Sequence, residues 1–539
     1  MAELTPMMQK YMETKEQYKD CILFYRLGDF YEMFFDDALV ASKELEITLT
    51  GKSCGLEERA PMCGIPYHAV EGYLSKLVSR GYKVAICEQV EDPKLAKGLV
   101  KREVIRVVTP GTNLNVQSLE AGKNNYLLSI AYTPDGIGIS AADVTTGDYY
   151  VTEVEDLKKL NDELMKYEPS EIICNEAFLV SGFDVNDLKS RLHISVNALE
   201  SHMFDDDGCR RILMKHFKVN TLIGLGVEEF PTGLLAAGAL LQYLYDTQKT
   251  DLEHFTHIYP YLTSKYMLLD SSTRRNLELT ETLREKQKRG SLLWVLDKTK
   301  TAMGARLLRN YIEQPLIEKD EMEKRLDAIQ ELNQDSISRD EIREYLNPIY
   351  DLERLLSKVT YKTANPRDLI AFRNSLQMLP PIKTVLSAFE KEELTKIREQ
   401  IDGLEDIYQL IDEAIIDEPP LSIREGGMIK DQFDETIDRL RSAKHDGKQW
   451  LAQLEEEDRE RTGIKNLKIK YNKVFGYYFE VTNSYKNLVP EDYIRKQTLA
   501  NAERYTTPRL KELEDTILNA EDKLQLSLIH ISEPTRLRC

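Results

Sequence analysis

The segment CILFYRLGDFYEMFF, residues 21–35, decides how the N-terminal part of the chain folds. It holds two short apolar runs separated by the turn-forming pair Gly28-Asp29, a pattern typical of buried strands. Further helical and strand-like patterns follow at residues 36–47, 68–80, 84–87 and 104–108. The sequence therefore predicts a small mixed α/β domain over residues 1–112.

Phe30 and Glu32 project from the same face if the second run is extended, because side chains alternate along a strand. The aromatic ring could stack on DNA bases or wedge between them, and the carboxylate could hydrogen-bond a base edge. A mispaired base is weakly held, so a wedge selects it without reading sequence. The alternative is an ordinary apolar strand in a core, which would bury Phe30.

Composition excludes several classes of protein. A length of 539 residues suggests three or four domains, and a net charge of −19 excludes a uniformly basic coat for nucleic acid. Any DNA contact is then a local basic patch on an acidic body. No apolar run is long enough to span a membrane, and the N-terminus lacks the layout of a secretory signal. The seven scattered cysteines contain no C-x-x-C pair, so we expect no zinc site and a cytoplasmic location.

The middle of the chain predicts a second α/β domain over residues 125–255 and a mostly helical part over residues 256–430. Asp143 follows a strand of the second domain, where a metal-dependent nuclease could hold a carboxylate. Such an enzyme needs several convergent acids, and the sequence places only this one. The alternative is an aspartate that caps a turn.

A small basic module follows a long polar helix that we expect from about residue 431 to residue 460. Alternation over residues 467–472 and an apolar run over residues 475–481 predict two strands. Residues 462–510 hold nine basic and four acidic side chains, which reverses the charge of the chain as a whole. This pattern is expected either for phosphate contacts or for a solvated lysine face. The candidate DNA-backbone residues are Lys465, Lys468, Lys470, Lys473, Arg495, Lys496 and Arg504.

Several long motifs resemble the MutS family of bacterial mismatch repair proteins. GDFYEMF (28–34) and PMCGIPYHA (61–69) are similar to its mismatch-recognition domain. TAMGARLLRNYIEQPL (301–316) is similar to its lever, and FGYYFEV (475–481) and RKQTLANAERY (495–505) are similar to its clamp. The motifs occur in the family's order over about residues 5–525.

The resemblance implies a multidomain fold that combines α/β parts with helical ones. Phe30 would then be the wedge at the mispair, and Glu32 would hydrogen-bond the mispaired base. The implied parts are a mixed α/β mismatch-recognition domain (1–112), a linker (113–122), a ribonuclease-H-like connector (123–255), a long-helix lever (256–430 and 498–525) and a small antiparallel β clamp inserted between the lever helices (431–497).

The resemblance also implies partners: double-stranded DNA with mispairs or small loops, a second copy in a homodimer, and the MutL protein. The full-length family uses ATP and Mg²⁺ in an ATP-dependent sliding clamp. This sequence holds no G-x-x-x-x-G-K-[ST] loop, so we expect no cofactor, no catalytic residue and no ATP hydrolysis in this chain. Residues 526–536 can be back-translated into a sequencing-adaptor-like sequence, so we expect an artefactual tail over 526–539 and a longer natural chain.

Two other functions remain open at this point. A metal-dependent nuclease could act through the connector, or a structural member of the wider family could bind branched DNA. The presence of Phe30 and Glu32 argues against the second, because such a member would have no use for a wedge. If Glu32 hydrogen-bonds a purine N7, we expect the carboxyl group to be protonated, because N7 only accepts hydrogen bonds and an ionised carboxylate donates none.

Overall fold

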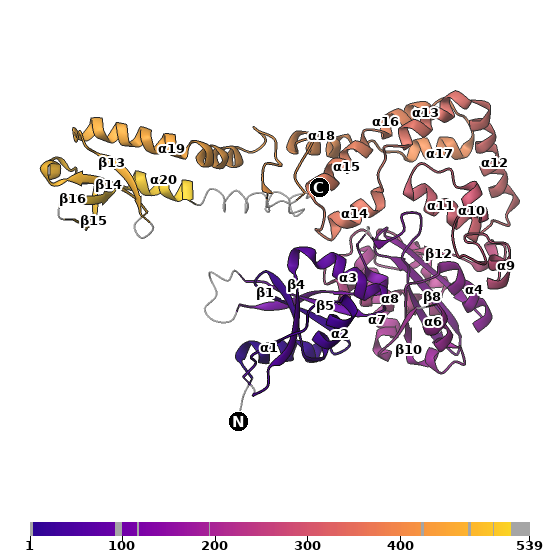
Figure 1. Cartoon of the computed structure of the whole chain (residues 1–539). Coiled ribbons are helices and arrows are strands. Elements are labelled where there is room, and N and C mark those ends of the chain that lie inside the picture. The colour runs from indigo at the N-terminus through magenta and orange to yellow at the C-terminus, as the bar shows by residue number, and fades with distance from the viewer. Residues whose placement is uncertain are drawn as a thin grey trace. The chain divides into compact units, whose positions relative to one another are not determined.

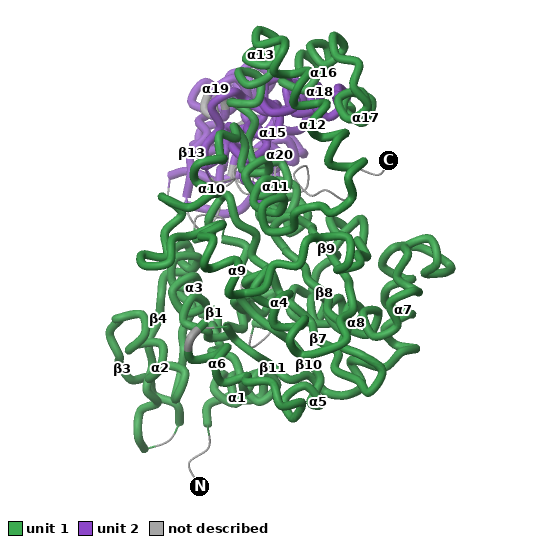
Figure 2. Tube along the Cα trace, turned by 90° about the vertical axis from the view of Figure 1, so that its right-hand side faces the viewer, with its two compact units in different colours: residues 1–363, 378–402 green, residues 364–377, 403–539 purple. Residues whose placement is uncertain are grey.

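The computed structural model describes residues 4–518 apart from residues 56, 92–99, 116–117, 193, 422–424, 473–475 and 500 (Figure 1). Two compact units are present: residues 1–363 with 378–402, and residues 364–377 with 403–539 (Figure 2). Each unit has hydrophobic clusters of its own. The tail expected over residues 526–539 lies outside the described residues.

The first unit begins with a mixed six-stranded sheet in the order β3-β4-β2-β1-β5-β6. Strand β1 pairs with β5 in parallel and with β2 in antiparallel fashion, and the apolar run at its start is buried, as expected for a central strand. The strands are β1 (Cys21–Leu27), β2 (Phe30–Phe34), β3 (Thr50–Lys52), β4 (Ala60–Pro66), β5 (Lys83–Gln89) and β6 (Arg102–Val108).

Helices cover both faces of this sheet. Helix α1 (Pro6–Gln17) places Met8 and Tyr11 against one face, while α2 (Phe35–Leu45) and α3 (Val70–Ser79) pack on the other. The N-terminal part therefore combines a mixed sheet with helices on both of its faces.

A second six-stranded sheet has the order β11-β10-β7-β8-β9-β12. Strands β7, β8 and β9 are antiparallel, and β10 and β11 continue the sheet in parallel with β7. Its strands are β7 (Leu127–Thr133), β8 (Gly136–Asp143), β9 (Asp148–Val154), β10 (Glu171–Asn175), β11 (Ser195–Leu199) and β12 (Tyr259–Pro260). Because β12 pairs with β9, the sheet extends past residue 255, where we placed the end of this part.

Helices α4 (Leu157–Tyr167) and α8 (Pro231–Gln248) pack on opposite faces of the second sheet, and α7 (Asp206–Phe217) packs on α8. The approach of α8 is close at Gly138 on β8. A Cβ atom there would lie 2.0 Å from the carbonyl oxygen of Thr232, so only glycine fits.

A buried carboxylate joins the two sheets. Glu171, at the start of β10, accepts hydrogen bonds from the Thr109 hydroxyl and, at 3.1 Å, from the backbone N–H of Gly111. Both donors lie directly after β6, the last strand of the first sheet. It also accepts from Asn197 at 2.9 Å and from the Tyr243 hydroxyl at 2.8 Å. Four donors stabilise the buried charge, and they fix the link between the sheets.

The rest of the first unit is helical, as the sequence predicts. Its helices are α9 (Ser271–Asn276), α10 (Leu292–Leu296), α11 (Ala302–Glu313), α12 (Lys319–Gln334), α13 (Ser336–Leu346), α14 (Leu352–Thr360), α16 (Leu379–Leu386) and α17 (Glu392–Gln400). Within the described residues, no helix is both long and apolar enough to span a membrane.

The second unit combines helices with a four-stranded antiparallel sheet in the order β13-β14-β16-β15. Its elements are α15 (Pro366–Leu376), α18 (Glu405–Ala414), α19 (Glu435–Thr462), β13 (Lys468–Asn472), β14 (Gly476–Thr482), β15 (Ile494–Thr498), β16 (Ala502–Thr506) and α20 (Pro508–Leu518). The long helix starts and ends within a few residues of the expected positions.

The β module extends past residue 497, where the resemblance places the end of the clamp. Strand β16 lies between β14 and β15 in the sheet, so the β module continues to Thr506 before helix α20 begins. The reason is physical: Tyr505 of this strand packs with Phe479 and Val481 in the module's core.

Candidate nucleic-acid interface

A tight turn holds the hairpin formed by β1 and β2. Gly28 and Asp29 are the two residues between the paired positions Leu27 and Phe30. Gly28 has φ +58°, a left-handed conformation that glycine adopts without strain. The backbone N–H of Tyr67 donates a 3.0 Å hydrogen bond to the carbonyl of Asp29, which ties the loop to the body.

Phe30 stands at the exposed end of strand β2. Its exposed fraction is 47%, whereas Tyr31, Met33 and Phe34 of the same strand are 5% exposed or less. The alternative interpretation, a strand buried in a core, therefore applies to the other apolar residues of β2 but not to Phe30. A large ring in solvent, on a strand whose other apolar residues are buried, is free to contact a ligand.

Arg26 braces the turn from the opposite face of the sheet. Its Nε atom donates to the carbonyl of Gly28 at 2.5 Å, its guanidinium stacks 3.7 Å from the centroid of the Tyr67 ring, and it pairs with Glu88 at 3.2 Å. The Tyr31 hydroxyl also donates to Glu88, and burial raises the pKa of that hydroxyl so that it keeps its proton. The hairpin is thus fixed before any ligand arrives.

Glu32 lies on the same face of β2 as Phe30 and forms an ion pair with Lys52. Its Oε2 atom is 2.6 Å from Lys52 Nζ, and the side chains are 17% and 34% exposed respectively. The Lys52 ammonium also lies 5.5 Å from the centroid of the Phe34 ring. Sequence reasoning did not identify Lys52, because only the strand register shows that it reaches Glu32.

Strand β4 lies between the two partners. Glu32 pairs in register with Gly64, and Lys52 pairs with Ala60 on the other edge of β4. A Cβ atom at Gly64 would lie 3.6 Å from Glu32 Cγ, so the absence of a side chain leaves the stem of Glu32 uncovered. The glycine therefore leaves room for the Glu32 side chain on this face of β4.

The basic β module has one apolar and one polar face. Ile469, Phe479 and Tyr505 point into its core, and the intervening residues of the same strands point outward. The register places Lys468 opposite Glu480, and Glu480 opposite Arg504, on the outer face. Three of the predicted basic residues therefore share one face: Lys468, Lys470 and Arg504.

Two of these three have partners of their own. Lys470 pairs with Glu480 at 2.8 Å, which raises the pKa of the lysine. Arg504 stacks 4.5 Å from the Tyr478 ring centroid and donates to Gln497 at 2.8 Å. Among the described residues, Lys468 has no ion pair.

The other predicted basic residues are dispersed. Lys465 is exposed in the turn before β13, and Lys496 is exposed on β15. Arg495 lies 3.6 Å from Glu503. Because the β15–β16 register shifts after Arg495, this residue pairs with the core residue Tyr505 and does not share the outer face. Lys473 lies outside the described residues.

Asp143 serves a turn. It is fully buried, and its two oxygens accept from the backbone and hydroxyl of Thr145 at 2.8 and 2.7 Å, from Asn124 at 2.9 Å and from the backbone of Asn125 at 3.0 Å. Burial and the nearby Asp143 raise the pKa of Asp148 to about 6. Across the described part of the chain, no three His, Cys, Asp or Glu side chains are grouped to hold a metal ion. The geometry does not favour the nuclease alternative.

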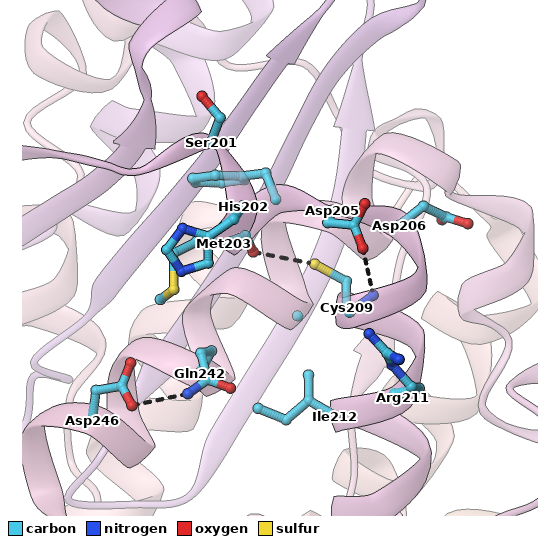
Figure 3. A pocket seen from close by; sticks show the side chains of 13 residues that line it. Ser201, His202, Met203, Asp205, Asp206, Cys209, Arg211, Ile212, Gln242 and Asp246 are labelled. Atoms are coloured by element: carbon cyan, nitrogen blue, oxygen red, sulfur yellow. Dashed lines mark hydrogen bonds between the residues drawn. The ribbon is translucent and has the colours of Figure 1, made fainter.

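A pocket of about 1030 Å³ opens between η4 (Ser201–Phe204), α7 and α8 (Figure 3). Asp205 accepts a 3.0 Å hydrogen bond from the backbone of Gly208, and the Gln242 amide donates to Asp246 at 2.9 Å. Its lining contains none of the residues predicted to contact DNA.

Comparison with known proteins gives a consistent result along the chain. Residues 5–117 match the family model of MutS domain I, residues 125–256 that of MutS domain II, and residues 272–532 that of MutS domain III. Three relatives carry the name DNA mismatch repair protein MutS. Those from Lachnoclostridium phytofermentans, Ruminiclostridium cellulolyticum and Acetivibrio thermocellus are 68%, 55% and 54% identical over 524, 527 and 529 residues. Each alignment covers 97% of this chain but only 56–60% of the relative's length.

Proposed function

The chain belongs to the MutS family, and on this premise we propose that it recognises DNA with mispaired bases or small loops, as part of mismatch repair. The observation that carries the proposal is the exposed Phe30 ring at the end of a strand whose other apolar residues are buried. Hydrogen bonds to the carbonyls of Gly28 and Asp29 fix the turn that precedes Phe30.

Phe30 is the wedge in this proposal. Stacking a base on an aromatic ring is worth about 1–3 kcal/mol, and bending a DNA site costs about 1–6 kcal/mol. These terms nearly cancel, so the result depends on how easily the site deforms. A mispaired base is already loosely stacked and paired, which makes its displacement cheaper than that of a matched base.

Glu32 is the residue that hydrogen-bonds the mispaired base. It shares the face of β2 with Phe30, two residues along the strand, which supports its acting on the same base step. Toward a purine N7 it must donate, so it carries a proton in that complex.

The basic β module holds the DNA backbone. Lys468, Lys470 and Arg504 on its outer face support this role, and the proposal extends to Lys465, Lys473, Arg495 and Lys496. Contacts to phosphates fix the protein on the duplex without reading the sequence.

We assign the family's parts to the structure in order. The first sheet is the mismatch-recognition domain, helices α9 to α18 and α20 belong to the lever, and α19 with the β13–β16 sheet is the clamp. The second sheet is a ribonuclease-H-like connector, supported by three antiparallel strands followed by two parallel ones.

The remaining family properties are proposals about the whole protein. They are a homodimer around DNA, ATP- and Mg²⁺-dependent conversion to a sliding clamp, recruitment of MutL, and a cytoplasmic location. We assign no residue of this chain to ATP or to a metal.

The test is binding of a labelled duplex with one unpaired base and of the same duplex fully matched, measured by fluorescence anisotropy. Phe30→Ala should lower the preference for the defective duplex about 5- to 100-fold and leave salt-sensitive binding of the matched duplex. Ile105→Ala is the control, because Ile105 is 45% exposed on β6 of the same sheet. Equal preference in Phe30→Ala and the unmodified chain, or no binding of either duplex, would refute the proposal.

A further inference from the structure

An acidic side chain beside a DNA wedge poses an electrostatic problem. DNA carries a phosphate charge about every 1.7 Å along its axis, so an uncompensated carboxylate on the DNA-facing strand is repelled on every matched sequence the protein visits. If Phe30 contacts DNA, the Glu32 carboxylate lies on the DNA-facing strand and needs a compensating charge.

The structure places a cation against this carboxylate. Lys52 Nζ lies 2.6 Å from Glu32 Oε2, and both side chains are more than half buried. An ion pair that is partly withdrawn from water is screened less than one on the open surface. The pair therefore lowers the net negative charge on this face of β2.

Lys52 reaches Glu32 along a defined path. It lies on the edge strand β3, on the same face as Ala60 and Gly64 of β4, and its ammonium lies 5.5 Å from the centroid of the Phe34 ring. Neither partner has another ion pair within the described residues.

We propose that Lys52 is the counter-ion of Glu32, which keeps the face beside Phe30 neutral while the protein is bound to matched DNA. This inference rests on the proposed function, since it requires that this face meets DNA. Lys52 is a positioning residue, because it acts through the charge and placement of Glu32.

The inference differs from an ordinary phosphate contact in one measurable way. A lysine that only contacts a phosphate contributes the same binding energy whether residue 32 is charged or neutral. A counter-ion matters only while residue 32 is charged, so its effect must disappear when Glu32 is made neutral.

The test is a double-mutant cycle on a matched duplex, where no mispaired base engages residue 32. The variants are Lys52→Met, Glu32→Gln and the double variant, and the measured quantity is the dissociation constant from anisotropy at low salt. Lys52→Met should weaken binding about 5- to 10-fold beside Glu32 and less than about 2-fold beside the glutamine. Lys52→Arg, which keeps the charge, should bind within about 2-fold of the unmodified chain.

Three outcomes would overturn the inference. They are an equal loss from Lys52→Met in both backgrounds, no loss in either, or tighter binding in Lys52→Met, which would make Lys52 a competitor for Glu32 rather than its support. Thermal unfolding of each variant identifies any loss of DNA binding that comes from an unfolded protein. Lys52→Arg restores binding only if the role of Lys52 depends on its charge.

The same preparations separate this inference from the proposed function. Phe30→Ala is measured on the matched duplex and on the duplex with an unpaired base. If Phe30→Ala keeps the mismatch preference, the proposed function fails whatever Lys52 does. If Phe30→Ala loses that preference and the double-mutant cycle shows no coupling, only the counter-ion assignment fails.

Discussion

The β1–β2 hairpin and the outer face of the β13–β16 sheet both present side chains from short antiparallel strands, but they present opposite chemistry. At the hairpin an exposed ring stands beside a carboxylate that forms an ion pair with a lysine. On the β13–β16 sheet, three basic side chains share a face with one acidic residue, Glu480. Under the proposed function, this difference would divide the work: the hairpin would respond to base stacking, and the basic face would respond to phosphates, which are the same in every sequence.

The largest expected effect comes from removing the charged side of this comparison. Replacing Lys468, Lys470 and Arg504 together by Gln should weaken binding of matched and defective duplexes equally, by about 10-fold or more, and reduce the salt slope by about 2–3. Anisotropy titrations over a range of salt measure both. A matched control replaces Lys215, Lys319 and Lys396 by Gln; these exposed lysines lie on helices outside the β13–β16 sheet. A change in mismatch preference would contradict this division of work.

Next in size is a change at the hairpin that keeps apolar bulk but removes the flat ring. Phe30→Leu should lower mismatch preference about 3- to 10-fold and leave matched binding and the salt slope unchanged, because leucine stacks poorly on a base. The ratio of the two dissociation constants is the measurement. If leucine matches phenylalanine, apolar volume rather than stacking carries the preference.

The turn that holds the ring can be strained without changing its surroundings. Gly28→Ala should destabilise the fold by about 1 kcal/mol, because alanine resists φ +58° while no atom lies within 4 Å of the new methyl group. Gly72→Ala is the control: it also has open space, but it lies in helix α3, where alanine should stabilise. Thermal unfolding measures both, and equal shifts of the same sign would contradict the role of the turn.

The smallest effect is expected at Glu32. Glu32→Gln should keep mismatch binding or strengthen it by about 2-fold, because the amide donates a hydrogen bond without the charge, while Glu32→Ala should reduce discrimination. Equal mismatch preference in Glu32→Ala and the unmodified chain would remove Glu32 from the recognition mechanism.

Local alternation predicted which residues share a face, but not which face is open. The pattern placed Phe30 with Glu32 correctly, and Lys468 with Lys470, because the period of a strand is fixed. It could not distinguish exposed Phe30 from buried Phe34 on the same face, since the burial depends on where helix α1 packs. The core alternative was therefore partly right.

Long-range pairing accounts for what the sequence could not show. Lys52 meets Glu32 only because β3 and β2 flank β4, and Arg495 leaves the outer face because the β15–β16 register shifts beside it. Strand β16 is short and contains charged residues, so its place between β14 and β15 had no local signal. Asp143, in contrast, followed turn chemistry that the neighbouring Thr-Thr-Gly already indicated.

The anchoring of Thr109 and Gly111 on Glu171 bears on how this protein can be recombined with its relatives. A chimera that exchanges the first 112 residues would separate the turn from its acceptor, and a Cβ atom at Gly111 would lie 2.9 Å from Leu127 and 3.1 Å from Glu171. A successful graft must transfer Thr109 and Gly111 together with their acceptor Glu171, so the exchanged segment must extend beyond the first sheet.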